Sequence, residues 1–300
     1  MANLVSCVQR LGSLRKLIKE KPIVRAMECH SGLSALIAEK AKAERADGSI
    51  AQFDALWSSS LTSSTIKAKP DIEVVDTTQR IQIVEDCLEV TTKPMIYDGD
   101  TGGLPEIFKF TVRKLESLGV SACIIEDKSG LKQNSLFGTD RKQNLADIRE
   151  FSHKLAVGQA AKQNPDFMII ARLEALIAGA GEEEALKRAK AYIEEGKVDG
   201  IMIHSKEKKP DEVLSFMEQY NKFPNKKPLV VVPTSYNSLT EEELAKAGAS
   251  ICIHANHLIR AAYPSMVDVA ESILKHGRSK EVEDEGRVMG VKKIISLIDE

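Results

Sequence analysis

Short apolar runs recur along the whole chain, and longer amphipathic segments separate them. Most of these runs are continuously apolar rather than alternating, which is typical of parallel strands that are covered on both faces. We predict eight such strands: Ile23–Met27, Ala55–Trp57, Pro94–Tyr97, Ala122–Ile125, Phe167–Ala171, Gly200–Ile203, Leu229–Val232 and Ser250–Ile253.

The segments between the strands have helical periodicity. Phe108–Leu118 repeats apolar residues at helical spacing, and Glu183–Glu195 pairs glutamates with basic residues four positions later. Gly119 and Gly196 follow these segments, as expected where helices end. Eight strand–helix units predict an α/β fold, a (β/α)8 barrel of the TIM type, and no GxGxxG turn after the first strand favours a dinucleotide-binding fold.

We expect residues 1–300 to form a single barrel domain, with barrel strands in 22–257 and C-terminal helices in 258–300. Leu258–Lys275 and Val291–Ile298 have helical periodicity, and a charged break at Arg278–Glu285 separates them. The last helix lies too far along the chain to complete the barrel by itself. We therefore expect a C-terminal helix that is swapped between subunits.

The composition excludes several classes of function. The 42 Lys and Arg residues nearly balance the 44 Asp and Glu residues, and a formal charge of −2 argues against a nucleic-acid partner. The apolar runs are too short to span a membrane and no secretory signal pattern begins the chain, so we expect no membrane partner and a cytoplasmic location. Five cysteines without CxxC or CxxH spacing indicate neither a disulfide framework nor a zinc site.

Polar residues follow almost every predicted strand. In this fold the chemistry lies at the C-terminal ends of the strands, so the series predicts an active site there, although any single member is equally typical of a cap or turn. The residues are Ser59, Ser60, Asp98, Asp100, Glu126, Asp127, Arg172, Glu174, His204, Thr234, Asn256 and His257.

Carboxylates gather at two neighbouring strand ends. Asp98 and Asp100 flank Gly99 at positions i and i+2, on the same side of an extended chain, and we expect Gly99 to leave room for a close ligand. Glu126 follows the next strand, and three hard oxygen ligands suit Mg²⁺. The alternative is a turn in which the aspartates bond only backbone amides.

Arg172 and His204 end two strands on the opposite side of the same barrel mouth, and both can donate hydrogen bonds to an anion. The alternative for Arg172 is an internal ion pair with Glu174. Cations that face carboxylates across one mouth favour a negatively charged substrate bridged by a metal ion.

A long polar loop, residues 126–138, follows the fourth strand and has a glycine near each end. Loops of this length between barrel elements often cover active sites, which would bring Lys132, Asn134 and Ser135 over the mouth. We expect residues 129–138 to be mobile without ligand and ordered with it. A solvated surface loop is the alternative.

Nine motifs resemble the isocitrate lyase/phosphoenolpyruvate mutase superfamily and, within it, the phosphoenolpyruvate mutases. Together they cover almost the whole chain. They are ECHSGLSA (28–35), WSSSLT (57–62), KPD (69–71), YDGDTGG (97–103), IEDKSGLKQNSLFG (125–138), ARLEA (171–175), MIHSK (202–206), VVPTSY (231–236) and ANH (255–257).

The resemblance implies an activity. The superfamily's lyases carry a cysteine in a KxCGH-type loop motif, whereas this chain has KQNS at 132–135 and resembles the mutases; the similar phosphonopyruvate hydrolases have threonine where Asn134 stands. The implied reaction is a Mg²⁺-dependent intramolecular phosphoryl transfer that interconverts phosphoenolpyruvate and 3-phosphonopyruvate. A phosphonopyruvate or oxaloacetate hydrolase and a catalytically silent binding subunit are the alternatives.

The resemblance also implies roles for site residues and an assembly. Asp98 would bind Mg²⁺ directly, with Mn²⁺ as a possible substitute, and the subunits would form a homodimer or homotetramer. The water molecules of the metal would be held by Asp100, Glu126 and Asp71, and the substrate carboxylate would be bound by backbone amides near Ser59, Ser60 and Leu61. The phosphoryl group would be bound by Arg172, His204, Asn134 and Ser135, and Lys132 is counted among the catalytic residues. Trp57 would form a pocket wall, a position equally typical of core.

Four residues depart from the usual pattern of these motifs. Cys29 and Ser31 replace the alanine and asparagine of an EAHNG-like motif, Gly99 replaces the alanine of DADTG, and His254 stands where an aromatic residue is expected. None of these changes removes an implied ligand.

Overall fold

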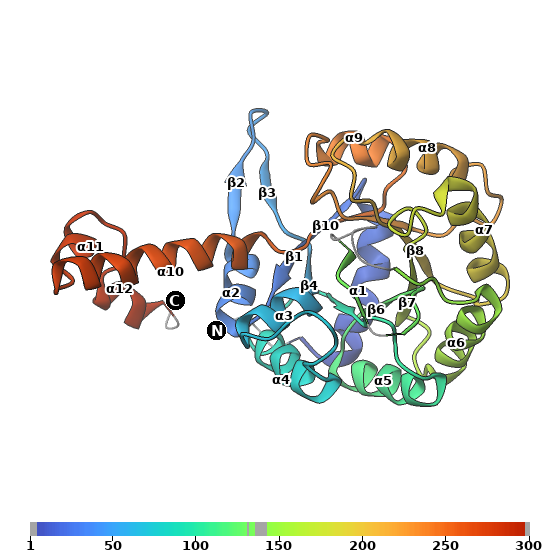
Figure 1. Ribbon diagram of the computed structural model, residues 1–300, viewed down its shortest axis with the longest axis horizontal. Helices are drawn as coiled ribbons and strands as arrows, with labels where there is room; N and C mark the ends of the chain where they lie inside the picture. Colours follow the sequence, from blue (N-terminus) through green and yellow to red (C-terminus); the bar gives the residue numbers. More distant parts are fainter. Residues whose placement is uncertain (1–4, 131, 136–142, 298–300) are drawn as a thin grey trace.

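The computed structural model describes residues 5–130, 132–135 and 143–297. Eight parallel strands close into a barrel in which each strand pairs with the next along the chain and the last pairs with the first (Figure 1). All eight predicted strands are confirmed, with ends that differ by a few residues. They are β1 (Val24–Cys29), β4 (Ala55–Ser58), β5 (Met95–Asp98), β6 (Ala122–Glu126), β7 (Met168–Leu173), β8 (Gly200–Ile203), β9 (Leu229–Val231) and β10 (Ile251–His254).

Helices surround the barrel and include both segments predicted from periodicity. Helix α5 (Pro105–Leu118) begins at a proline and is followed by Gly119, whose φ of 81° lies in the left-handed region that favours glycine. No described helix is both long and apolar enough to cross a membrane. The barrel helices are α2 (Gly32–Lys40), α3 (Ser60–Ile66), α4 (Thr77–Leu88), α5 (Pro105–Leu118), α6 (Ile148–Ala161), α7 (Gly181–Glu194), α8 (Asp211–Tyr220) and α9 (Glu241–Lys246).

The core has two layers. Trp57, Ile124 and Ile170 fill the inside of the barrel together with Leu14 from α1 (Cys7–Glu20), the N-terminal helix. Arg15 of this helix donates a hydrogen bond to the Asp166 carbonyl, which precedes β7, so α1 covers the N-terminal end of the barrel. The second layer lies between the strands and the helices. The C-terminal ends of the strands are therefore left for the site.

A two-stranded hairpin, β2 (Lys42–Glu44) and β3 (Ile50–Gln52), projects from the barrel before β4 (Figure 1). The apolar pattern did not predict it, because its strands are three residues long and almost entirely exposed. Arg45 holds it to the barrel by donating to Glu241 in α9 at 3.0 Å.

The chain leaves the barrel after β10. Helix α10 (His257–His276) carries α11 (Lys280–Asp284) and α12 (Val291–Ser296) away from it as one arm (Figure 1). The charged stretch predicted as a break contains the short helix α11. Only Ile259 and Ser272 are buried along the 20 residues of α10. The predicted exchange of this arm between subunits stays a prediction.

Candidate active site

A pocket at the C-terminal ends of the strands contains most of the predicted site residues. It has about 540 Å³ of space, including its open mouth. Every residue predicted to touch substrate lines it: Trp57, Ser59, Ser60, Leu61, Asn134, Ser135, Arg172 and His204. Asp71, Asp98 and Lys132 also line it, together with Met202, Val232, Thr234, Ala255 and Asn256.

Asp98 ends β5 and lies against the start of α3. The Ser60 amide and hydroxyl both donate to Asp98 Oδ2, at 3.0 and 2.8 Å, and the Asp100 amide donates to Oδ1 at 3.3 Å. The alternative in which the aspartates bond only backbone amides is therefore realised in part, since the Ser60 hydroxyl also donates to Asp98. Burial would raise the pKa of Asp98, but the charges of Lys132 and Arg80 lower it to about 2, so this carboxylate is ionised at neutral pH.

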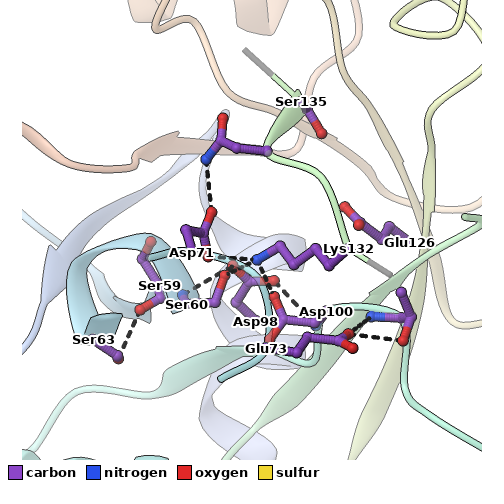
Figure 2. Close-up of polar contacts among 12 residues, drawn as sticks. Ser59, Ser60, Ser63, Asp71, Glu73, Asp98, Asp100, Glu126, Lys132 and Ser135 are labelled. Carbon is purple, nitrogen blue, oxygen red and sulfur yellow. Dashed lines mark hydrogen bonds and ion pairs between the residues drawn. The ribbon is translucent and has the colours of Figure 1, made fainter. Parts of the chain in front are cut away.

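Lys132 extends from the 126–138 loop into the carboxylates, as Figure 2 shows. Its ammonium donates to Asp71 Oδ1 at 2.7 Å and to Ser60 Oγ at 2.6 Å, and it also contacts Asp100. Asn134 of the same loop donates to Asp71 Oδ2 at 2.6 Å. Residues 132–135 therefore lie in the mouth of the barrel, whereas residues 131 and 136–138 of the segment predicted to be mobile lie outside the described residues.

Arg80, on the inner face of α4, is a site residue that the sequence did not reveal. Its side chain is buried, donates to Asp100 Oδ2 at 2.8 Å and stacks 4.3 Å from the ring centre of Tyr97. The available signal was a basic residue among the apolar positions of an amphipathic helix. Asp71, Asp98, Asp100 and Glu126 are called the acidic half of the site below.

Arg172 and His204 face the acidic half from β7 and the end of β8. Both lie on the carboxylate of Glu174: Arg172 donates through Nε, and His204 Nδ1 lies 3.0 Å from Glu174 Oε1. Arg172 thus forms the ion pair with Glu174 that was the predicted alternative, and it also lines the pocket. Arg172, His204 and Ser135 are called the basic half of the site below.

The protonation states in the basic half follow from burial and charge. Burial would raise the pKa of Glu174, but Arg172, His204 and Lys128 hold it well below its usual range. His204 Nδ1 lies 3.0 Å from Glu174 Oε1, which only accepts hydrogen bonds, and 3.1 Å from Arg172 Nη2, which only donates them, so both groups hold the imidazole ring in place. Burial and the charge of Arg172 lower the pKa of His204, which is therefore neutral at pH 7.

Glu126 is the least satisfied carboxylate of the acidic half. It is 1% exposed, and neither of its oxygens accepts a hydrogen bond, although Arg172 Nη2 lies 3.2 Å from Oε2. Burial raises its pKa to about 7. Within residues 5–130, 132–135 and 143–297 no three Asp, Glu, His or Cys side chains form a preformed metal cluster.

The donor set nevertheless fits a hard cation. It offers the ionised Asp98, the oxygens of Glu126, which accept no hydrogen bond, and Asp71 and Asp100, which both contact Lys132. Oxygen ligands of this kind suit Mg²⁺. The predicted roles of Asp98, Asp100 and Glu126 as metal ligands stay predictions.

The expectation about Gly99 needs correction. Gly99 leaves no room for a ligand, because a Cβ there would lie 2.7 Å from Ile125 Cγ2 and 2.8 Å from Cys123 Sγ in β6. Its missing side chain faces packed core instead. Of the amides of residues 59–61, that of Ser60 donates to Asp98, and the role expected for this segment in binding the substrate carboxylate stays a prediction.

Comparison with known proteins agrees with this geometry. The family model described as phosphoenolpyruvate phosphomutase matches residues 14–274. A phosphonopyruvate hydrolase from Variovorax sp. (strain Pal2) is 37% identical over 287 residues, which cover 95% of this chain and 93% of the relative. A phosphoenolpyruvate phosphomutase from Tetrahymena pyriformis is 35% identical over 293 residues, 97% of this chain and 92% of the relative.

A solved structure gives the same result. The complex of a phosphonopyruvate hydrolase with oxalate and Mg²⁺ superimposes with a TM-score of 0.83 at 35% identity and covers 97% of this chain and 95% of that chain. Relatives with two different activities are thus about equally similar to this chain. The barrel, the arrangement of the pocket and these similarities together show that the chain is an enzyme of the phosphoenolpyruvate phosphomutase family, within the isocitrate lyase superfamily.

Proposed function

We propose that this enzyme is a phosphoenolpyruvate mutase, which interconverts phosphoenolpyruvate and 3-phosphonopyruvate. The observation that carries the proposal is the position of Asn134 in the pocket, with its amide on Asp71. An amide at neutral pH neither removes a proton from water nor attacks phosphorus, whereas it can donate to a phosphoryl oxygen. This chemistry favours transfer within the substrate over hydrolysis.

We propose Mg²⁺ as the cofactor, with Mn²⁺ as a substitute. Asp98 would hold it directly, and Asp71, Asp100 and Glu126 would hold its water molecules. When bound, the ion supplies the positive charge that lets an anionic substrate approach these carboxylates. The similar phosphonopyruvate hydrolase with bound oxalate and Mg²⁺ supports this assignment.

The proposed reaction breaks one bond and forms another within a single molecule. The bond between phosphorus and the enol oxygen breaks, and its electron pair stays on that oxygen, which becomes the carbonyl oxygen. The π electrons of the enolate then form the bond from C3 to phosphorus. No proton, water molecule or redox equivalent is consumed.

The side chains of the pocket therefore have to position the phosphoryl group and stabilise its charge. Arg172 and Asn134 line the pocket and carry N–H donors, and each such donor contributes about 3 to 4 kcal/mol when it acts in the transition state. Trp57, Met202 and Val232 provide apolar walls that exclude water, which would otherwise capture the phosphoryl group.

A phosphonopyruvate hydrolase is the second candidate, and the Variovorax relative, 37% identical, favours it. The two reactions would use the same acidic and basic halves. They differ in whether C3 or water receives the phosphoryl group.

The test is the identity of the product. Purified enzyme with Mg²⁺ and phosphonopyruvate should form phosphoenolpyruvate, which phosphorus NMR detects directly. Inorganic phosphate and pyruvate as the main products would establish the hydrolase instead. Absence of any reaction would contradict both candidates.

A further inference from the structure

The carboxylate of Glu174 lies behind the basic half of the site without lining the pocket. Its exposure is 0%, and four side chains converge on its two oxygens. The sequence suggested only an ion pair with Arg172. The contacts show a larger set of dependent groups.

Glu174 Oε1 orients two groups that line the pocket. It accepts from Arg172 Nε, and Arg172 Nη2 then donates to Ser135 at 2.7 Å and lies 3.2 Å from Glu126 Oε2. It also lies 3.0 Å from His204 Nδ1, and Arg172 Nη2 lies 3.1 Å from the same nitrogen, so the imidazole ring is held with Nδ1 toward this ion pair. One oxygen thus determines the direction of both candidate phosphoryl ligands.

Glu174 Oε2 holds the loop residue Ser135. The Ser135 hydroxyl donates its single proton to Oε2 at 2.6 Å and accepts from Arg172 Nη2 and Lys128 Nζ, both at 2.7 Å. Lys128 itself lies 3.1 Å from Oε2. Because its proton is used, the Ser135 hydroxyl bridges Glu174 to Arg172 and does not donate to a ligand in this arrangement.

The backbone of Glu174 is fixed as well. Its amide donates to Asp127 Oδ1 at 2.8 Å, and Asp127 Oδ2 accepts from Arg188 at 3.0 Å and Tyr192 at 2.8 Å, both in α7. The carboxylate is therefore held on a rigid support between β6, β7 and α7.

We infer that Glu174 is the positioning residue of the basic half: one buried carboxylate aims Arg172 and His204 at the phosphoryl group and holds Ser135 in the pocket. The inference rests on the proposed function for the identity of that group. It predicts that loss of the Glu174 charge selectively weakens recognition of the phosphoryl part of the substrate.

Glu174→Gln tests this inference, because the variant keeps the volume but places an NH₂ group where one of the two acceptors was. Calorimetry in Mg²⁺ would compare oxalate, which has no phosphoryl group, with phosphonopyruvate. We expect the affinity for oxalate to stay within about threefold and that for phosphonopyruvate to fall about tenfold or more, with kcat lower by on the order of 10².

Glu116→Gln is the matched control. Glu116 is also a buried glutamate, but its carboxylate accepts from the Gln163 and Asn164 amides, which precede β7 and so lie toward the N-terminal ends of the strands, opposite the pocket. This variant should lower the melting temperature without changing either affinity. Equal weakening of both ligands by Glu174→Gln, or no weakening, would overturn the inference.

Lys128→Met gives an independent variant should Glu174→Gln not fold. Lys128 supports Glu174 and Ser135, is buried and does not line the pocket. The same selective loss of phosphonopyruvate affinity is expected, and unchanged affinities would contradict the inference. Binding without conversion by the wild type would refute the proposed reaction but still allow the variants to be compared, whereas no binding of phosphonopyruvate would overturn both.

Discussion

At the scale of single residues, the four departures from the usual motifs all lie outside the pocket lining. Cys29 packs against Cys87, and Ser31 caps α2 by accepting from the Ser34 amide at 3.2 Å. Gly99 is required by its contacts with β6, and His254 lies 3.1 Å from Glu241. These residues therefore adjust packing around the barrel, and the pocket keeps the side chains that the motifs imply.

Asn134 provides the first test at this scale. Asn134→Ala removes the amide that we assign to the phosphoryl group, and the interconversion should slow by on the order of 10² or more through loss of one transition-state donor. Phosphorus NMR time courses measure it. Asn237→Ala, at an exposed position after β9, is the control and should leave the rate unchanged. A rate for Asn134→Ala within twofold, or about 0.4 kcal/mol, of wild type would contradict the assignment.

Arg80 provides a second test, because it fixes the orientation of Asp100 from outside the pocket. Arg80→Met should weaken Mn²⁺ binding by about 10- to 100-fold, as loss of a residue that orients a metal ligand does. Electron paramagnetic resonance measures the free Mn²⁺ without turnover.

The control for Arg80 is Arg10→Met. Arg10 is another buried arginine, but it donates to the Leu88 and Thr91 carbonyls. It should lower stability and leave Mn²⁺ affinity unchanged. Equal Mn²⁺ affinity in both variants and wild type would show that Arg80 serves packing alone.

At the scale of elements, the hairpin and α9 meet around Glu241. Its carboxylate accepts from Arg25 and Arg45 and lies beside His254, so three segments far apart in sequence share one charge. Burial would raise the pKa of Glu241, but the hydrogen bonds from His254 and Arg25 lower it to about 2. The contact thus links α9 to β1, β10 and the hairpin.

The lowered pKa of Glu241 gives a pH prediction for stability. The folded pKa lies below the unfolded value of about 4.3, so the contribution is complete above that pH and is lost as the pH falls toward 2. Glu241→Gln should cost about 2 kcal/mol of unfolding free energy near neutral pH, and the difference from wild type should shrink in acid. Urea unfolding at several pH values measures it.

Glu242→Gln, at the next residue, is the matched control for this element. The Glu242 side chain is 71% exposed and makes only a 3.4 Å contact with Arg45. We expect little effect at any pH. A difference between Glu241→Gln and wild type that does not change with pH would show that shape rather than charge holds the elements together.

At the scale of the whole molecule, the arm formed by α10–α12 has no partner within the described chain that covers its apolar side chains. Leu274 is 83% exposed and Ile295 68% exposed. Glu28 of β1 holds the start of the arm, accepting from the Ile259 amide at 2.8 Å, so the arm projects in a set direction. We therefore predict that it packs on a second subunit, in a homodimer or homotetramer.

Light scattering after gel filtration tests this assembly. Leu274→Glu with Ile295→Glu should shift the protein toward monomer, because burial of each side chain contributes about 1.5 to 3 kcal/mol. Ile50→Glu, at a 57% exposed apolar position of the hairpin, is the control and should leave the assembly unchanged. A monomeric wild type would contradict the predicted exchange.

The apolar pattern by itself determined the eight strands, their parallel arrangement and the rim at which the pocket lies, because parallel strands must be apolar on both faces and barrel pockets collect at their C-terminal ends. Motifs added the residues of the pocket. The exposed hairpin β2–β3 escaped prediction, since three-residue strands without burial leave no apolar signature.

Apart from the Arg172–Glu174 pair, which the sequence offered as an alternative, only the tertiary structure decided how the charges pair. Lys132 meets Asp71 from 61 positions away and Arg80 meets Asp100 from 20. Glu174 adds His204 and Ser135, from two other segments, to Arg172. Such pairs leave no periodic signal in the sequence, because a single polar residue looks the same there whether it caps a turn or pairs with a buried charge. Folding brings them together, and in a buried site the cost of an unpaired charge makes those pairings specific.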